Sequence, residues 1–402
     1  MRSTLALTAS IFFLVSLSCQ SGGARQKDHS TIKLGYFGDL SGPTLNFGIS
    51  GRNGVLMAVD EINQAGGIDG RPLDVVIEDD QGSPEKAAAQ TAKLIDIDRA
   101  VAVIAGGTSS NSRAAAPKAQ VSAIPMISPS STDPAVTQIG DFIFRACFID
   151  AFQGEVMARF ASNTLKAHKA AILLDFNSSY SRGLADFFEL SFTRLGGQVV
   201  SKQSYTQGDR DFRGQLNTVH TAGPDVIFVP GYYGDVALIA RQARQLGFNQ
   251  PLLGGDGWDA PELWDLAGDA VNGSYISSHY SIEDQSPIVQ RFVREYKQRY
   301  GNLAPDAHAA LAYDATRLLA DALQRAGSTE GPKLRDALAQ TKDFIGVTGS
   351  ISIDADRNAV KPAVVLKLQD GRFIYQETIH PETTPAPPSG SPVPNQTASP
   401  AR

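Results

Sequence analysis

The sequence lacks the motifs that most enzymes and metal-binding proteins carry. It has only two cysteines among 402 residues, and its six histidines never fall at metal-ligand spacing. It contains no P-loop, no G-x-G-x-x-G after a predicted strand, no G-x-S-x-G elbow and no H-E-x-x-H helix. No nucleophile has a general base nearby in the sequence. We therefore expect no enzymatic activity, no cofactor and no bound metal.

Clusters of basic residues are also missing. The formal net charge is -6, charged residues make up 19% of the chain, and no Lys/Arg stripe interrupts this balance. Proteins that bind nucleic acid carry an electrostatic footprint of basic side chains that neutralise phosphates. We therefore do not expect nucleic acid as a partner.

Long apolar runs are absent apart from one near the N-terminus. Residues 5–17 (LALTASIFFLVSL) follow Arg2, but a bilayer span takes roughly 20 apolar residues. This layout is typical of a secretory signal, which we predict at residues 1–19. Cys19 follows Ser-Leu-Ser, so the site resembles a bacterial lipoprotein cleavage box, and ordinary cleavage after this small-x-small pattern is the alternative. We expect lipidation of Cys19, which would anchor the protein at a membrane surface outside the cytoplasm.

Scarcity of cysteine bears on stability as well. If Cys19 carries the anchor, Cys147 has no partner, and no intramolecular disulfide can form although the compartment would permit one. The fold must then be stabilised by its core. Residues 20–30 are predicted to be a flexible tether, and the Pro/Ser/Thr-rich residues 381–402 a disordered tail.

What the chain does have is an alternation of short apolar runs and longer amphipathic segments. Between residues 31 and 146 the runs IKLGYFG, LDVVIED, VAVIAGG and IPMISP alternate with helical patterns, which indicates βαβ units around a parallel sheet. The same grammar restarts after residue 145, and a helix-rich region and short closing strands follow. Two doubly wound α/β units side by side suggest a cleft between them. In such sheets ligands bind outside the carboxyl ends of the strands, where the strand order reverses.

Small polar residues gather where two predicted strands of the first unit end. Residues 105–112 read AGGTSSNS, and the next strand runs into ISPSSTDP. A helix beginning at such a loop exposes free N–H groups and the positive end of its dipole, which favours an anion. Ser or Thr capping its own helix is the alternative. Two such loops at adjacent strand ends favour a carboxylate site.

An acidic run, Glu78-Asp79-Asp80, ends another predicted strand. Carboxylates at this spacing suit a metal or acid/base chemistry. They stand directly before a Gly-Ser-Pro helix start, however, which is typical of a turn. We interpret them as a solvated turn.

Taken in order, these motifs resemble a known family. The order SGP, INQAGGIDGRPL, EDDQGSPEKA, MISPSSTDP, FIFRAC, a Tyr-x-x-Gly after LLDF, FVPGYY, RQARQLGF and LLGGDGWD is similar to the leucine/isoleucine/valine-type periplasmic binding proteins of ABC transporters, over nearly all of residues 31 to 376. The resemblance implies an α/β fold of two doubly wound parallel-sheet lobes joined by a hinge, the type I periplasmic binding protein fold. It assigns residues 31–145 plus 280–355 to lobe 1 and 146–279 plus 356–380 to lobe 2. The chain would cross the hinge near residues 145, 280 and 355.

The resemblance also implies a site for the ligand carboxylate on lobe 1. Ser109 matches the serine of the loop after the third strand. In the ISPSST loop, Ser131 would offer its backbone N–H and Thr132 its hydroxyl.

The other end of the ligand would meet lobe 2. Asp256 in GGDG matches the acidic residue that binds the ammonium, helped by Tyr180. Phe47 and Tyr232 match aromatic groups that cover the ligand, and Trp258, beside Asp256, would form a further wall. Read without the resemblance, Asp256 between glycines would be a turn residue.

The function implied is capture of a small amino acid, branched-chain or related, by hinge closure, and its delivery to a membrane permease of an ABC importer. We expect a monomer in the periplasm or outside the cytoplasm. Leucine-selective relatives carry Glu where this chain has Asp256, and His308 stands where some have an aromatic, so the side-chain preference stays open. The alternatives are a ligand-sensing module and a binder of an amide or of an aromatic or aliphatic carboxylate.

Overall fold

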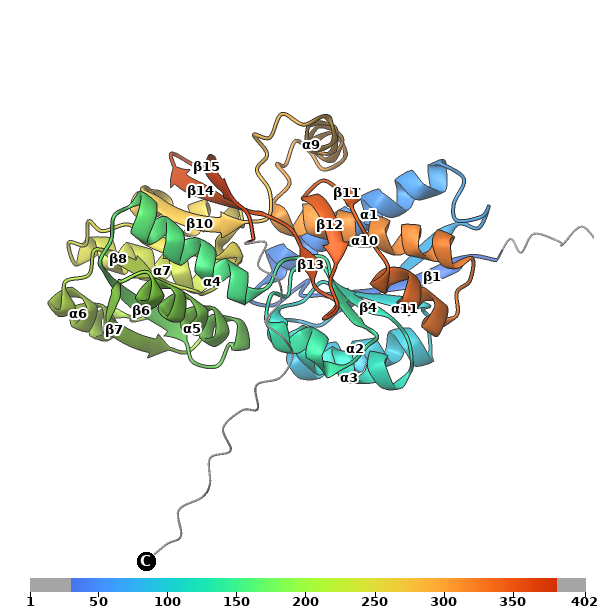
Figure 1. Ribbon diagram of the computed structural model, residues 1–402, viewed down its shortest axis with the longest axis horizontal. Coiled ribbons are helices and arrows are strands. Elements are labelled where there is room, and N and C mark those ends of the chain that lie inside the picture. Colours follow the sequence, from blue (N-terminus) through green and yellow to red (C-terminus); the bar gives the residue numbers. More distant parts are fainter. Residues whose placement is uncertain (1–29, 382–402) are drawn as a thin grey trace, which may run out of the picture.

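A computed structural model describes residues 30–381, which form two α/β halves placed side by side (Figure 1). The predicted signal at 1–19 with Cys19, the tether up to residue 29 and the tail from residue 382 lie outside the described residues. Between them the alternation of strands and helices follows the predicted βαβ pattern. The prediction of two doubly wound α/β lobes is confirmed.

The first half is built on a parallel five-stranded sheet. Its strand order is β2-β1-β3-β4-β5, which places β1 between β2 and β3. The strands are β1 (Ile32–Gly38), β2 (Leu73–Asp79), β3 (Ala102–Ala105), β4 (Met126–Ser128) and β5 (Ile143–Arg145). The chain order of these strands reverses between β1 and β3, and this switch point is where doubly wound sheets bind ligands.

The second half repeats that topology and extends it. Its order is β15-β14-β10-β9-β8-β6-β7, so the parallel strands β6 to β10 follow the same order as β1 to β5. The strands are β6 (Lys169–Asp175), β7 (Gln198–Tyr205), β8 (Val226–Phe228), β9 (Leu252–Gly254), β10 (Ser274–Ser278), β14 (Ala363–Gln369) and β15 (Arg372–Ile379). The last two are antiparallel and come from the end of the chain.

Helices cover both faces of each sheet. The α-helices are α1 (Leu45–Gln64), α2 (Pro84–Asp96), α3 (Ser109–Val121), α4 (Asp150–Arg159), α5 (Ser179–Arg194), α6 (Arg213–Ala222), α7 (Tyr233–Gln245), α8 (Glu262–Ala267), α9 (Pro287–Arg299), α10 (Ala307–Ala326) and α11 (Gly331–Ala339). Shorter turns of 3-10 helix lie at η1 (Pro134–Ile139), η3 (Asp256–Trp258) and η4 (Gly268–Val271), and a π-helical turn at η2 (Phe160–Thr164). The predicted start of α2 is present: Ser83 caps the helix and Pro84 is its first residue.

The strands are buried because each sheet separates two apolar layers. On one face of the first sheet, Leu34, Ile104 and Phe144 pack with residues of α1, α10 and α11. On the other face, Val103 and Ile143 pack with α2 and α3. The second sheet is sandwiched in the same way. Parallel strands buried on both faces explain the continuous apolar runs in the sequence.

The chain passes between the halves in three places. The first follows β5 and the second follows β10. The third comes at Lys361 and Pro362, a few residues later than the predicted crossing near 355. The crossing lies later in the chain because the preceding residues belong to a small third sheet. In this sheet β12 (Gly349–Ile353) pairs with both β11 (Phe344–Gly346) and β13 (Ala359–Val360). Asn358 also accepts a hydrogen bond from Thr137 in the first half.

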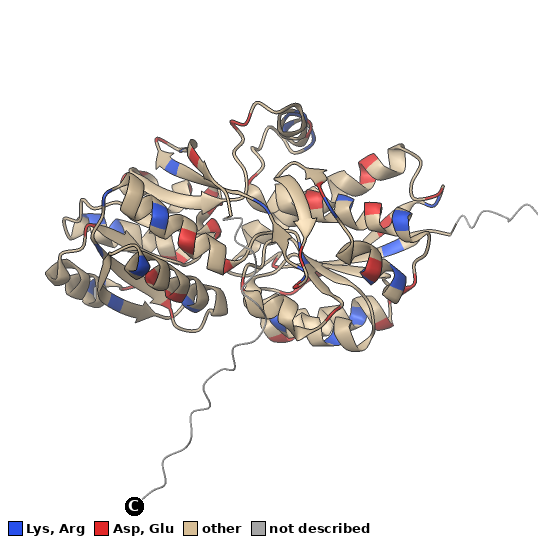
Figure 2. Cartoon of the chain, viewed as in Figure 1, with Lys and Arg blue, Asp and Glu red and all other residues tan. Residues whose placement is uncertain are grey.

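Charged side chains of both signs are interspersed over the two halves in the view of Figure 2. Among residues 30–381, no helix combines the length and the apolar character needed to cross a membrane.

Candidate functional site

The predicted site residues converge where both sheets have their switch points. Phe47 follows β1, and Gly106 follows β3 in the first half. In the second half Tyr180 follows β6, Tyr232 follows β8 and Asp256 follows β9. Because the carboxyl ends of parallel strands meet at one edge of a sheet, these loops from both halves face a common space.

That space is a cavity with about 300 Å³ of atom-free volume, open solvent included. It is lined by Phe47, Gly106, Gly107, Thr108, Ser130, Tyr180, Tyr232, Asp256, Gly257 and His308. Phe47, Tyr180, Tyr232 and Asp256 were predicted from the sequence. Thr108 and Ser130 are neighbours of the predicted serines, and His308 comes from α10.

A larger hollow, about 1080 Å³ including open solvent, lies beside the crossings. It is bordered by residues such as Tyr280, Thr348 and Tyr375, together with the carboxylates of Glu283 and Asp284. His279 and the hydroxyls of Ser281 and Thr348 also line it, but the Glu283 and Asp284 carboxylates would repel the carboxylate of a ligand. The smaller cavity matches the predicted chemistry.

Asp256 is the charged centre of the cavity. Its carboxylate is 4% exposed and accepts hydrogen bonds from the Tyr180 hydroxyl and the Gln153 amide, each at 2.9 Å. His279 Nε2 lies 3.1 Å from the second oxygen. Burial raises the pKa of Asp256, but the hydrogen bond and charge of His279 and the bond from Gln153 outweigh it, and the net pKa lies below its usual range. Asp256 is therefore a stabilised anion.

His279 supports this anion from the end of β10. Its side chain is fully buried, and its ring stacks on Phe148 with the centroids 3.8 Å apart. Burial lowers the pKa of His279, while the hydrogen bond to Asp256 opposes this. Because the ionised Asp256 carboxylate can only accept, the ring donates its Nε2–H to it.

A second buried carboxylate, Asp150, lies near Asp256. It begins α4, directly after the first crossing, and its oxygens make no hydrogen bond of good geometry, although the Thr132 hydroxyl acts on the carboxyl. Burial raises the pKa of Asp150 well above its usual range, and the negative charge of Asp256 raises it further. The sequence analysis missed Asp150, Gln153 and His279, although Asp150 follows a predicted strand as the other site residues do.

The loop after β3 combines the two roles considered for it. Thr108 caps α3, since its hydroxyl accepts from the Asn111 N–H at 3.5 Å, and it also lines the cavity. Gly106 has to be glycine because a Cβ there would lie 2.4 Å from the ring of Tyr36. Ser109 points elsewhere: its hydroxyl accepts from the Asp133 N–H at 3.3 Å and does not line the cavity.

The loop after β4 is held in place by hydrogen bonds from Arg145. This fully buried guanidinium donates to the carbonyls of Ser131 and Asp133. The Ser131 N–H already donates to Ser128 Oγ at 3.0 Å. The Thr132 hydroxyl, in contrast, is buried and faces the carboxyl of Asp150, on which it acts by hydrogen bonding. Neither Ser131 nor Thr132 borders the cavity, whereas Ser130 does.

Cys147 supports the same loop. Its thiol lies 3.4 Å from the Ser131 carbonyl, and burial raises its pKa to about 12. A thiol in this state is a small core residue rather than a nucleophile.

Aromatic rings from both halves cover the cavity. Phe47 meets Tyr232 edge-on with the centroids 5.9 Å apart, and Tyr180 stacks on Tyr232 at 5.2 Å. Trp258 is placed differently from its prediction. Its indole is fully buried in the core of the second half and donates to the Val229 carbonyl at 2.9 Å, so it does not border the cavity.

His308 is the remaining lining residue and lies in the first turn of α10. Its ring stacks on Phe47 with the centroids 3.8 Å apart and is 7% exposed. Neither ring nitrogen makes a hydrogen bond of good geometry. His308, which stands where some relatives have an aromatic residue, therefore borders the cavity.

The two halves touch across the cavity. Asn46 donates to the Tyr233 hydroxyl at 3.1 Å, and the hydroxyl oxygens of Ser110 and Ser179 are 3.4 Å apart. Phe47, from the first half, contacts Tyr232 and Tyr233 of the second. The structure is a closed arrangement.

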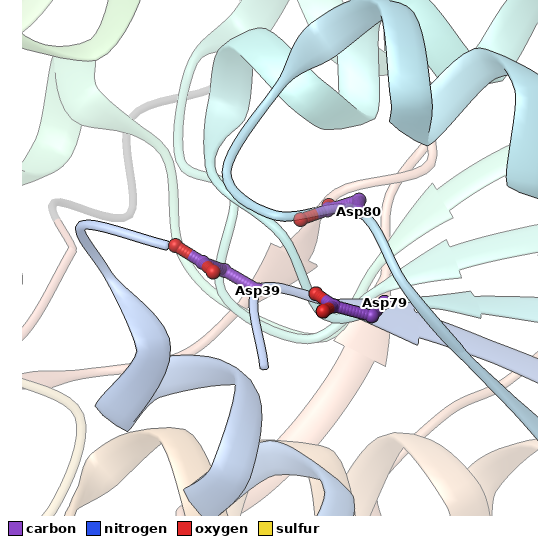
Figure 3. A group of neighbouring side chains, drawn as sticks. All are labelled: Asp39, Asp79 and Asp80. Atoms are coloured by element: carbon purple, nitrogen blue, oxygen red, sulfur yellow. The ribbon is translucent and has the colours of Figure 1, made fainter. Parts of the chain in front are cut away.

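Figure 3 shows a separate group of carboxylates, Asp39, Asp79 and Asp80, at the ends of β1 and β2. Oxygens of this kind suit a hard cation. All six oxygens of these three carboxylates, however, already accept hydrogen bonds. Most of the donors are backbone N–H groups of the two loops, and Asp80 also accepts from Asn111. The cluster therefore braces the loops. The interpretation as a solvated turn is wrong for Asp80, which is fully buried between them.

Comparisons with known proteins agree with this geometry. The family model described as periplasmic binding protein matches residues 31–372. The chain is 30% identical to the leucine-, isoleucine-, valine-, threonine- and alanine-binding protein of Pseudomonas aeruginosa, over 81% of this chain and 86% of that protein.

Solved structures are similar over the same range. A leucine-binding protein of Thermotoga maritima has 38% identity and a TM-score of 0.84, covering 87% of this chain and 99% of that one. A branched-chain amino acid transporter substrate-binding protein of Streptococcus pneumoniae, in complex with isoleucine, has 36% identity and a TM-score of 0.83, covering 87% and 100%.

Proposed function

The chain belongs to the periplasmic binding protein family, and from this premise we propose that it is the substrate-binding protein of an ABC importer, which captures a small amino acid, branched-chain or related, and delivers it to a membrane permease. The names of the similar proteins include leucine, isoleucine, valine, threonine and alanine as ligands. The geometry of the cavity supports the same ligand class for this chain.

One observation carries the proposal. Asp256 is a buried anion on the wall of a cavity, paired with the Tyr180 hydroxyl, and the wall from the other half is the start of α3. The first N–H groups of a helix have no partner within the helix, and the helix dipole favours an anion there. A zwitterionic ligand would place its ammonium at Asp256 and its carboxylate at the loops of Thr108 and Ser130.

Closure follows from this arrangement. The two charged ends of the ligand would be held by opposite halves, so that only the ligand-bound closed state satisfies both. A transporter can then distinguish loaded from empty protein by the closed shape.

The test is calorimetric titration of protein stripped of ligand by unfolding and refolding. The titrants are amino acids and their analogues without the amino group. Asp256→Asn should weaken amino-acid binding, because an ammonium buried without a counter-charge costs roughly 3 to 5 kcal/mol, or about two to three and a half decades in Kd.

Asp259→Asn is the matched control. Asp259 is a buried carboxylate of the same loop that accepts from Ser278 at 2.6 Å and does not border the cavity. Its substitution should leave affinity nearly unchanged. Undiminished amino-acid binding by Asp256→Asn would defeat the assignment of the ammonium site.

A second ligand class is favoured by the same site. Asp256 already receives hydrogen bonds from Gln153, Tyr180 and His279, so it does not need an ammonium to be stabilised. An aromatic or aliphatic carboxylate without an amino group would then bind the loops of the first half alone. Binding of only the deaminated analogues in the titration would establish this alternative.

We also propose that Cys19 is lipidated and holds the protein at a membrane surface in the periplasm or outside the cytoplasm. The support is the apolar run of residues 5–17 and the Ser-Leu-Ser sequence before the cysteine. Mass spectrometry of the N-terminal peptide should find an acylated Cys19, and Cys19→Ser should release the protein from membranes. An unmodified mature N-terminus at or beyond Cys19 would contradict this.

A further inference from the structure

His308 is an unsatisfied polar group on the wall of the ligand cavity. Its ring is 7% exposed, and both Nδ1 and Nε2 are buried without hydrogen bonds of good geometry. Other polar side chains of the wall have partners: Thr108 is bound to Asn111, Tyr180 to Asp256, and Asp256 to three donors. Apart from the loops of Thr108 and Ser130, the imidazole is the polar group of this wall whose hydrogen bonding is incomplete.

The protonation state of His308 decides what can satisfy it. Burial lowers its pKa to about 4, although the negative charge of Asp256 and a weak hydrogen bond to the Asp256 backbone oppose the shift. At neutral pH the ring is neutral and offers one N–H donor and one lone pair. A hydroxyl or an amide can both donate and accept, so either group can use both capacities of the ring. A second carboxylate would meet the repulsion of Asp256.

His308 also comes from a different element than the predicted carboxylate loops, which follow β3 and β4. It comes from α10 and stacks on Phe47, whose ring contacts Tyr232 of the other half. In the wall formed by these three rings, the Tyr232 hydroxyl is hydrogen-bonded to Ser178, and the imidazole edge is the other polar group. A ligand held by its α-carboxylate and ammonium would turn its side chain toward a wall of this kind.

We propose that His308 makes the site selective for an amino acid whose side chain carries a hydroxyl or amide group, over an aliphatic side chain of the same shape. An aliphatic side chain would displace water from the ring and leave it unpaired, and an unsatisfied buried polar group is costly. The proposal rests on the proposed function for the ammonium and carboxylate, but it concerns a different part of the ligand.

Two nearly isosteric ligand pairs test it: threonine against valine, and asparagine against leucine. Calorimetry on the stripped wild-type protein should give a Kd for the polar member of a pair that is lower by about tenfold or more. His308→Phe keeps the ring stacked on Phe47 but removes both nitrogens, and should abolish or invert the preference. His308→Gln restores a donor and an acceptor and should recover part of it.

His308→Leu provides a second apolar variant should His308→Phe unfold, and thermal melting of each variant checks folding. A polar-to-aliphatic Kd ratio that is the same in the wild type and in either apolar variant would overturn the proposal. So would wild-type protein that binds the aliphatic members more tightly.

The proposed function can fail separately. If amino acids do not bind, the pair 3-hydroxybutanoate and 3-methylbutanoate repeats the comparison of threonine and valine without the amino group. A hydroxyl preference that disappears in His308→Phe would then sustain the role of His308 while the ammonium site at Asp256 is abandoned. Absence of that preference would remove both.

Discussion

At the scale of single residues, the site is marked by buried polar atoms that the protein itself does not satisfy. The ring nitrogens of His308 make no hydrogen bond of good geometry, although the ring borders the cavity. Folded proteins rarely leave such atoms unpaired, because each costs about 1 to 3 kcal/mol. A ligand or water in the cavity can complete the hydrogen bonding of this ring.

Asp150 gives a pH-dependent prediction. Its folded pKa is raised by burial, so the folded state favours the protonated form. The stability this contributes is fully present below the pKa of the unfolded chain, about 3.9, and is lost as pH rises toward the folded pKa. Asp150→Asn, which is neutral at every pH, should therefore gain stability relative to wild type as pH rises from 4 to 8.

Urea unfolding of both proteins at several pH values measures this difference. Asp74→Asn, at an exposed position, provides the baseline for removing one negative charge. If the difference between wild type and Asp150→Asn stays constant from pH 4 to 8, Asp150 is ionised in the folded protein and the assigned direction of its pKa is wrong.

At the scale of helices and strands, most of the fold was predictable from hydrophobic periodicity. The runs around Ile32–Gly38, Leu73–Asp79 and Lys169–Asp175 are strands as expected, because strands of a parallel sheet are buried on both faces and read as continuous apolar segments. The repeated strand order was not predictable. Which strand lies beside which depends on helix packing across the sheets, and local periodicity does not record it.

The site was predictable only in part, for a related reason. Asp256 and Tyr180 lie beside short motifs at strand ends, and the family resemblance identified them. Gln153 and His279 contact Asp256 from 103 and 23 residues away and carry no local signal of that contact. Trp258 shows the opposite error. It neighbours Asp256 in sequence, but successive residues of a short helical turn point in different directions, and the indole fills the core.

At the scale of the whole molecule, the closed arrangement depends on a small contact between halves joined by three chain crossings. Ser110, in the first turn of α3, and Ser179, in the first turn of α5, face each other with their hydroxyl oxygens 3.4 Å apart. These helices begin at the switch points of the two sheets and border the site. If closure traps the ligand, they must separate whenever it enters or leaves.

A disulfide between these positions should lock the molecule shut. In Ser110→Cys/Ser179→Cys, with Cys19 replaced by Ser, a bond of about 2.05 Å is within reach of small rotamer changes, and Cys147 is buried and cannot compete. Protein oxidised with ligand bound should release it at least about tenfold more slowly, because a closed site must open before exchange. Protein oxidised while empty should fail to take ligand up.

Stopped-flow dilution measures the rate of ligand release, and calorimetry measures uptake by the empty protein. The single variant Ser110→Cys is the control, and reduction of the disulfide should restore wild-type behaviour. Exchange at an unchanged rate in fully oxidised protein would mean that ligand enters without separation of α3 from α5, and the hinged trap would have to be given up.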